Sequence, residues 1–112
     1  MKTIPGFLIF LMICSCSPDP IPQDQMVYVG VWQGSNIFLE IDANGNASYA
    51  KLRDGAVIET VDSPVKKIGD GKIVIGYLFI TKTLELTKPP FEEDGNWKMI
   101  IDGVTLTKQT TL

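Results

Sequence analysis

Five turn dipeptides divide this chain into short segments, and their positions constrain the fold more than any other feature. They are Asn44-Gly45, Asp54-Gly55, Asp70-Gly71, Asp94-Gly95 and Asp102-Gly103. Asn-Gly and Asp-Gly are favoured in tight β-hairpin turns, because these residues adopt the positive φ angles that such turns need. The segments between them are rich in Val, Ile, Thr, Tyr, Phe and Trp, which favour strands. The pattern predicts antiparallel β-structure with little or no helix.

The apolar pattern also predicts the register of two hairpins. A three-residue turn around Asn44-Gly45 places four apolar side chains on one face, with Ile41 opposite Ala47 and Leu39 opposite Tyr49. A two-residue turn at Asp102-Gly103 gives three pairs: Ile101 with Val104, Met99 with Leu106, and Trp97 with Lys108.

The segment from Lys72 to Thr87 is too long for one ordinary strand. Gly76 marks an expected bulge or bend within it, since glycine inside a strand weakens the strand at that point. A turn is expected near Thr81-Lys82-Thr83.

Seven to nine short strands leave two architectures, a small closed barrel or a sandwich. The predicted fold class is therefore all-β, over residues 26–112. The side chains expected to point inward are Val29 or Trp32, Leu39, Ile41, Tyr49, Ile75, Phe79, Met99, Ile101 and Leu106. Most of them are large, and a small barrel has little room, so we expect them to fill the interior.

Gly30-Val31-Trp32 resembles the G-x-W sequence that opens the first barrel strand of lipocalins. In that family the Trp closes one end of the barrel by packing against a basic residue of the last strand. The resemblance implies that Lys108 takes the place of that basic residue. It extends to barrel shape only, and the alternative is that Trp32 is an ordinary core side chain.

The first residues differ in character from the rest. From Ile4 to Cys14 the chain is apolar apart from Pro5-Gly6, and Lys2 precedes this run. Eleven residues in a helix reach about 16 Å, roughly half of the hydrocarbon core of a bilayer. A secretion signal over residues 1–15 explains this pattern better than a membrane span does.

Ile13-Cys14-Ser15-Cys16 resembles the lipobox of bacterial lipoproteins, in which a small residue precedes the cysteine that receives the lipid. The resemblance implies cleavage between Ser15 and Cys16, a diacylglyceryl thioether on Cys16, and attachment to a membrane. Ser17 after that cysteine further implies sorting to the outer membrane, facing the periplasm. The alternative is an ordinary signal peptide followed by a Cys14–Cys16 disulfide.

Residues 16–25 combine the expected lipidated cysteine with a proline-rich segment, SPDPIPQDQ. Prolines and the scarcity of apolar side chains predict an extended, disordered tether. The whole chain has 10 basic and 13 acidic residues, and no basic stripe that would indicate a nucleic-acid partner.

The sequence indicates a protein that is not an enzyme. It contains no histidine, which is the commonest general base and metal ligand, and lipidation of Cys16 leaves no thiol nucleophile. We expect no catalytic residue, metal site or cofactor. A binding patch is expected where exposed carboxylates lie between two aromatic residues, at Phe91, Glu92, Glu93, Asp94 and Trp97.

Two functions remain. The first is a membrane-anchored binding or protein-interaction module of the cell envelope, with an envelope protein or peptidoglycan as its partner. The alternative is a carrier of a small hydrophobic ligand, by fold-level analogy with lipocalins. A filled interior favours the first function, and an apolar cavity favours the second.

Overall fold

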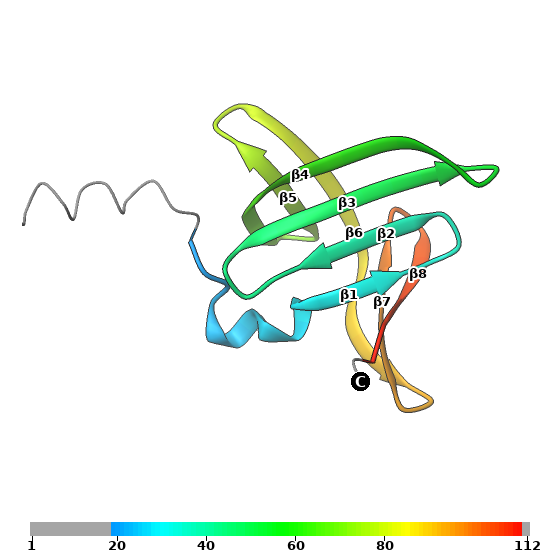
Figure 1. Ribbon diagram of the computed structural model, residues 1–112. Coiled ribbons are helices and arrows are strands. Elements are labelled where there is room, and N and C mark those ends of the chain that lie inside the picture. Colours follow the sequence, from blue (N-terminus) through cyan, green and yellow to red (C-terminus); the bar gives the residue numbers. More distant parts are fainter. Residues whose placement is uncertain (1–18, 111–112) are drawn as a thin grey trace, which may run out of the picture.

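Eight consecutive strands close into an antiparallel barrel in the computed structural model, which describes residues 19–110 (Figure 1). The elements are η1 (Gln23–Tyr28), a 3-10 helix, followed by β1 (Gly30–Gln33), β2 (Ile37–Ile41), β3 (Asn46–Arg53), β4 (Ala56–Gly69), β5 (Lys72–Tyr77), β6 (Ile80–Glu93), β7 (Asn96–Ile101) and β8 (Val104–Lys108). β1 pairs with β8, with Trp32 opposite Lys108 and Gln33 opposite Thr107. This pairing decides between the two expected architectures, because the sheet closes on itself and no second sheet packs against it. The all-β class is confirmed.

Every predicted turn dipeptide lies in a hairpin turn. The four Asp-Gly pairs form two-residue turns in which both residues have positive φ, from 49° to 55° for the aspartates and from 75° to 81° for the glycines. The turn at Asn44-Gly45 has three residues, as the apolar pattern predicted: Ile41 lies opposite Ala47, and Leu39 opposite Tyr49.

The register of the last hairpin is confirmed over most of its length. Ile101 lies opposite Val104, and Met99 opposite Leu106. The pairing ends one step later, at Lys98 and Thr107, so the expected Trp97–Lys108 pair is not part of this ladder. Lys108 pairs with β1 instead, because closure of the barrel brings the two end strands together.

The expected turn at residues 81–83 is wrong. The chain turns at Leu78-Phe79, since Tyr77 lies opposite Ile80. Gly76 is not a bulge, because it pairs regularly with Thr81. The backbone of Gly76 lies very close to the neighbouring strand, since a Cβ atom at this residue would be 2.3 Å from the carbonyl oxygen of Ile80.

The long strands β4 and β6 each change partner part-way along. β4 pairs first with β3 and then with β5, and β6 pairs first with β5 and then with β7. In β6 the register with β7 shifts between Lys88 and Phe91. Pro89-Pro90 lies within that interval, where a residue without an N–H group interrupts the ladder least.

Side chains from every strand except β4 are fully buried in the barrel, and β4 adds partly buried residues such as Val61 and Val65. The side chains with less than 2% of their surface exposed are Trp32, Leu39, Ile41, Tyr49, Ile73, Ile75, Leu84, Met99, Ile101 and Leu106. Trp32, not Val29, is the inward residue of β1. Phe79 was expected inside and is 87% exposed, because it lies at the tip of a hairpin that projects beyond the core. The other expected inward residues are confirmed.

The segment before η1 packs on the barrel, which corrects the expected tether over its described part. Ile21 is 8% exposed and belongs to the core cluster, and its N–H donates to the carbonyl of Ala43 at 3.1 Å. Gln25 lies in η1, and its side chain donates to the carbonyl of Ile68 at 2.9 Å. The apolar content of the segment is low, but one isoleucine at the right place is enough to hold it against the barrel.

Candidate functional site

The expected binding patch lies at the tip of the β6–β7 hairpin. Glu93 pairs with Asn96 across the Asp94-Gly95 turn, and Glu92 pairs with Trp97 one step further from the tip. The three carboxylates are exposed, as expected. The two aromatic residues are only half exposed, since Trp97 packs against the core. The hairpin therefore has carboxylates at its tip and aromatic side chains nearer the barrel.

Basic side chains partly neutralise this patch. The ammonium group of Lys98 lies 3.1 Å from a carboxylate oxygen of Glu93. The ammonium group of Lys88 lies 4.1 Å from the ring centre of Phe91, within cation–π range. The other two carboxylates of the patch, Glu92 and Asp94, make no ion pair within residues 19–110.

The lipid-attachment and cleavage residues expected from the lipobox, Ser15 and Cys16, lie outside the described residues. Within residues 19–110 no helix is long and apolar enough to cross a membrane.

One end of the barrel is closed by Trp32 and Lys108. The indole N–H donates to the carbonyl of Tyr28 at the end of η1, at 2.9 Å. The Lys108 ammonium group lies 5.1 Å from the ring centre of Trp32 and donates to the carbonyl of Val27 at 2.7 Å. Burial lowers the pKa of Lys108 below its ordinary value. The contact that the G-x-W resemblance implied is present, and η1 holds both side chains in place.

Gly30 makes room for this lysine. A Cβ atom at residue 30 would lie 3.2 to 3.3 Å from three carbons of the Lys108 side chain, and φ at Gly30 is +144°, which L residues rarely adopt. Another residue at this position would be strained by its φ angle and would have to displace the Lys108 side chain by a few tenths of an ångström.

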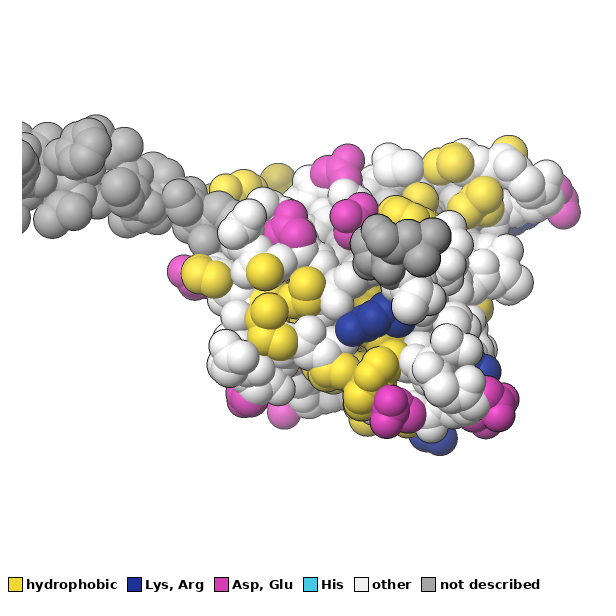
Figure 2. All heavy atoms as spheres, turned by 60° about the horizontal axis from the view of Figure 1, so that its bottom comes forward, with side chains coloured by type: hydrophobic (Ala, Val, Ile, Leu, Met, Phe, Trp, Pro, Cys, Tyr) yellow, Lys and Arg dark blue, Asp and Glu magenta, His cyan; other side chains and the backbone are white. Residues whose placement is uncertain are grey.

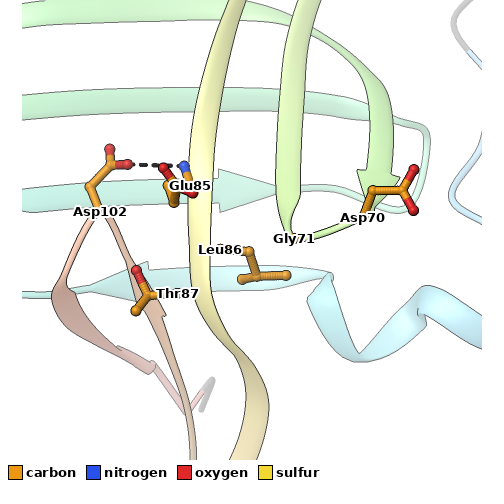
Figure 3. A pocket seen from close by; sticks show the side chains of 6 residues that line it. All are labelled: Asp70, Gly71, Glu85, Leu86, Thr87 and Asp102. Carbon is orange, nitrogen blue, oxygen red and sulfur yellow. Dashed lines mark hydrogen bonds between the residues drawn. The ribbon is translucent and has the colours of Figure 1, made fainter.

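A surface depression of about 760 Å³ lies where β6 changes partner (Figure 3). It is lined by Asp70, Gly71, Glu85, Leu86, Thr87 and Asp102. A carboxylate oxygen of Asp102 accepts a hydrogen bond from the backbone N–H of Glu85 at 2.9 Å, and Thr87 accepts one from Gly103 at 3.2 Å. These contacts tie the β7–β8 turn to β6.

Two of the carboxylates that line this depression, Asp70 and Asp102, make contacts within the fold. Asp70 pairs with Lys67, and that hydrogen bond lowers the pKa of the Asp70 carboxyl. Among residues 19–110 no three His, Cys, Asp or Glu side chains are grouped so that they could hold a metal ion.

A surface feature that the sequence reasoning missed lies at the β5–β6 hairpin tip. Four consecutive large apolar residues are exposed there: Tyr77 by 58%, Leu78 by 74%, Phe79 by 87% and Ile80 by 76%. Beside them is a groove of about 490 Å³, lined by Lys66, Lys67, Val74, Leu78, Phe79 and Thr81. Ile73 and Leu84 both point inward and pair with each other across this hairpin. Leu78-Phe79 lies midway between them in the chain, so a pairing of these two apolar residues would have located the turn.

The three main depressions open on the surface, and none of the ten fully buried side chains named above lines them. Figure 2 shows one face, on which basic side chains are few and separate and acidic ones lie mostly toward the rim. Comparison of the chain with protein-family models, curated proteins and solved structures finds no match.

Proposed function

We propose that this protein is a lipid-anchored, non-catalytic binding or interaction module of the bacterial cell envelope. The lipid is attached to Cys16 after cleavage behind Ser15, and the barrel faces the periplasm from the outer membrane. Its partner is another envelope protein or peptidoglycan. The observation that carries the proposal is the sequence of the first 16 residues, where an apolar run ends in Ser15-Cys16.

The filled barrel supports binding at the surface over carriage of a ligand. A carrier needs an interior space, since ligand pockets for small molecules have volumes of about 300 Å³ or more. Here the interior contains large side chains such as Trp32, Tyr49 and Met99, none of them measurably open to solvent. A partner is therefore expected to contact loops and hairpins on the outside.

The acidic β6–β7 tip remains our candidate for that contact. β6 has 14 residues and would extend over about 45 Å if it were straight, so this tip stands far from the β5–β6 tip at its other end. Figure 1 shows the two tips on opposite sides of the barrel. The described chain starts at the left of Figure 1, away from the acidic tip, which leaves that tip free to meet a partner.

Metabolic labelling with palmitate tests the anchor. We expect label in the unmodified protein and in Cys14→Ser, and no label in Cys16→Ser. Two or more acyl chains hold a protein stably, so the labelled protein should need detergent for release from membranes. Label that persists in Cys16→Ser, or is absent from the unmodified protein, would overturn the proposal.

A further inference from the structure

The β5–β6 turn departs from the chemistry of the four Asp-Gly turns. It uses Leu78-Phe79, with Leu78 at φ +53°. A left-handed conformation is unfavourable for leucine by about 1–2 kcal/mol, because its Cβ approaches the following carbonyl oxygen. The leucine contributes nothing to the core in return, since it is 74% exposed.

The side chains at the tip of this hairpin are apolar, and the side chains beside the tip include two lysines. Leu78, Phe79 and Ile80 are the most exposed apolar side chains, and Tyr77 adjoins them with a ring and a hydroxyl group. Lys66 and Lys67 on β4 border the groove beside the tip. Lys66 donates to the carbonyl of Leu78 and makes no ion pair within residues 19–110, whereas Lys67 pairs with Asp70.

This order of side chains matches the profile of a bilayer surface. Leu, Phe and Ile favour the hydrocarbon, tyrosine favours the interface, and lysines favour the phosphate level. A convex tip of four side chains also suits a fluid surface, which can close around it, better than a rigid partner that needs a matching groove.

The tip lies on the side of the barrel where the chain arrives. Lys66 and Lys67 line both the groove beside Leu78 and a second depression that is bordered by residues 19–22. Figure 1 shows the start of the described chain and this tip on the same side of the molecule, at the left. Residues 16–19 can span at most about 11 Å, so a membrane that holds Cys16 lies close to this side.

We propose that the β5–β6 tip inserts Leu78, Phe79 and Ile80 into the surface of a phospholipid bilayer, as a second attachment beside the lipid anchor. The orientation argument rests on the proposed function, but insertion of the tip does not, since it follows from the turn, its exposure and the lysines. The tip then fixes the barrel's orientation, with the acidic β6–β7 tip directed away from the membrane.

Vesicle flotation with a chain that begins at Ser17 tests the tip without the anchor. The strand pairings that close the barrel and the core side chains named above lie within residues 19–110, and this chain contains all of those residues. We expect it to float with vesicles of phosphatidylethanolamine and phosphatidylglycerol at lipid concentrations of about a few millimolar, the range set by a single weak hydrophobic attachment.

The decisive variant is Leu78→Asn/Phe79→Gly, because Asn tolerates the positive φ of residue 78 and Gly tolerates any φ at residue 79, so the barrel should remain folded. We expect its vesicle affinity to fall at least tenfold and its melting temperature to be unchanged or higher. The matched control is Val57→Ser/Ile58→Ser, which removes the other exposed apolar pair, on β4, and should keep vesicle affinity within about twofold.

A second readout is Phe79→Trp with brominated lipids, whose bromine atoms quench a tryptophan that enters the bilayer. The added indole should be quenched, and the signal from buried Trp32 should not. Failure of the unmodified chain to float, equal flotation of the Asn-Gly variant, or dimerisation that this variant abolishes would each overturn the proposal. Loss of palmitate label with flotation retained would refute only the anchor.

Discussion

At the scale of single residues, Tyr49 stands out because it combines a core position with a polar atom. Its side chain is buried inside the barrel, and its hydroxyl group has no hydrogen-bond partner. The nearest charged group over its ring is Lys82, whose ammonium lies 5.5 Å from the ring centre and is paired with Glu59 at 3.1 Å. A buried hydroxyl without a partner lowers stability by about 1–3 kcal/mol.

We therefore expect Tyr49→Phe to leave the free energy of unfolding unchanged or to raise it by about 1 kcal/mol, because the ring stays and the unpaired hydroxyl is removed. Urea denaturation measures this. Tyr49→Ala is the matched control, and it should lose about 3–5 kcal/mol through the cavity that it leaves. A loss above 1 kcal/mol in Tyr49→Phe would mean that the hydroxyl is bonded in solution.

The same hydroxyl gives a prediction for alkaline pH. Burial raises the pKa of Tyr49 above its ordinary value, with smaller influences from Lys82 and Glu59. The unfolded chain then releases this proton at a lower pH than the folded chain does. The contribution of protonated Tyr49 to the free energy of unfolding is fully present below a pH of about 10. It is lost as the pH rises toward the pKa of Tyr49 in the folded state. We expect the stability advantage of Tyr49→Phe over the unmodified protein to widen above pH of about 10; a constant difference up to pH of about 12 would contradict the shift.

At the scale of elements, the segment of residues 19–28 changes role between sequence and structure. Ile21 reaches the core, and its backbone N–H is bonded to Ala43 beside the β2–β3 turn. Gly45 in that turn permits the approach, because a Cβ atom there would lie 2.0 Å from the carbonyl oxygen of Asp19. The segment therefore packs against the barrel wall and does not act as a free spacer.

Gly45→Ala should displace this segment. We expect faster hydrogen exchange at the Ile21 amide and earlier proteolysis within residues 19–28. Gly55→Ala is a matched control, since Gly55 also has positive φ, +81° against +97° for Gly45, but has no atom within 4 Å of the added Cβ. Both variants should lose about 1–3 kcal/mol from backbone strain, and only Gly45→Ala should expose Ile21. Equal exchange at Ile21 in the two variants would refute the docking.

At the scale of the whole molecule, the filled interior favours binding at the surface over carriage of a ligand inside the barrel. Ten side chains with almost no exposed surface occupy the barrel, and η1 with the Trp32–Lys108 contact closes one end. Protein interiors are close-packed, so a barrel filled in this way has no room for a ligand unless side chains are removed.

A lipophilic dye titrated into the chain from Ser17 onward should therefore show no saturable uptake into the interior. Because the dye can also bind the exposed β5–β6 tip, the Leu78→Asn/Phe79→Gly variant serves as the reference. Any signal lost in that variant comes from the tip. Saturable uptake at one dye per barrel that persists in the variant and is displaced by fatty acids would support the carrier function instead.

Local features of the sequence were sufficient for much of the fold. The Asp-Gly turns, the three-residue turn at Asn44-Gly45 and the inward side of most strands follow from backbone preferences and from period-two alternation, which act over a few residues. The acidic hairpin of the candidate patch was placed for the same reason. How far Phe91 and Trp97 are exposed could not be predicted, because it depends on how the core packs beneath them.

Other features were decided only by the tertiary structure, because each depends on contacts between residues far apart in the chain. Closure into a barrel required β1 and β8 to meet, and a sandwich fitted the same strand pattern. Ile21 became a core residue only once the β2–β3 turn stood beside it. Leu78-Phe79 carries no turn preference of its own, so the pairing of β5 with β6 forces the turn there and leaves four apolar side chains in solvent.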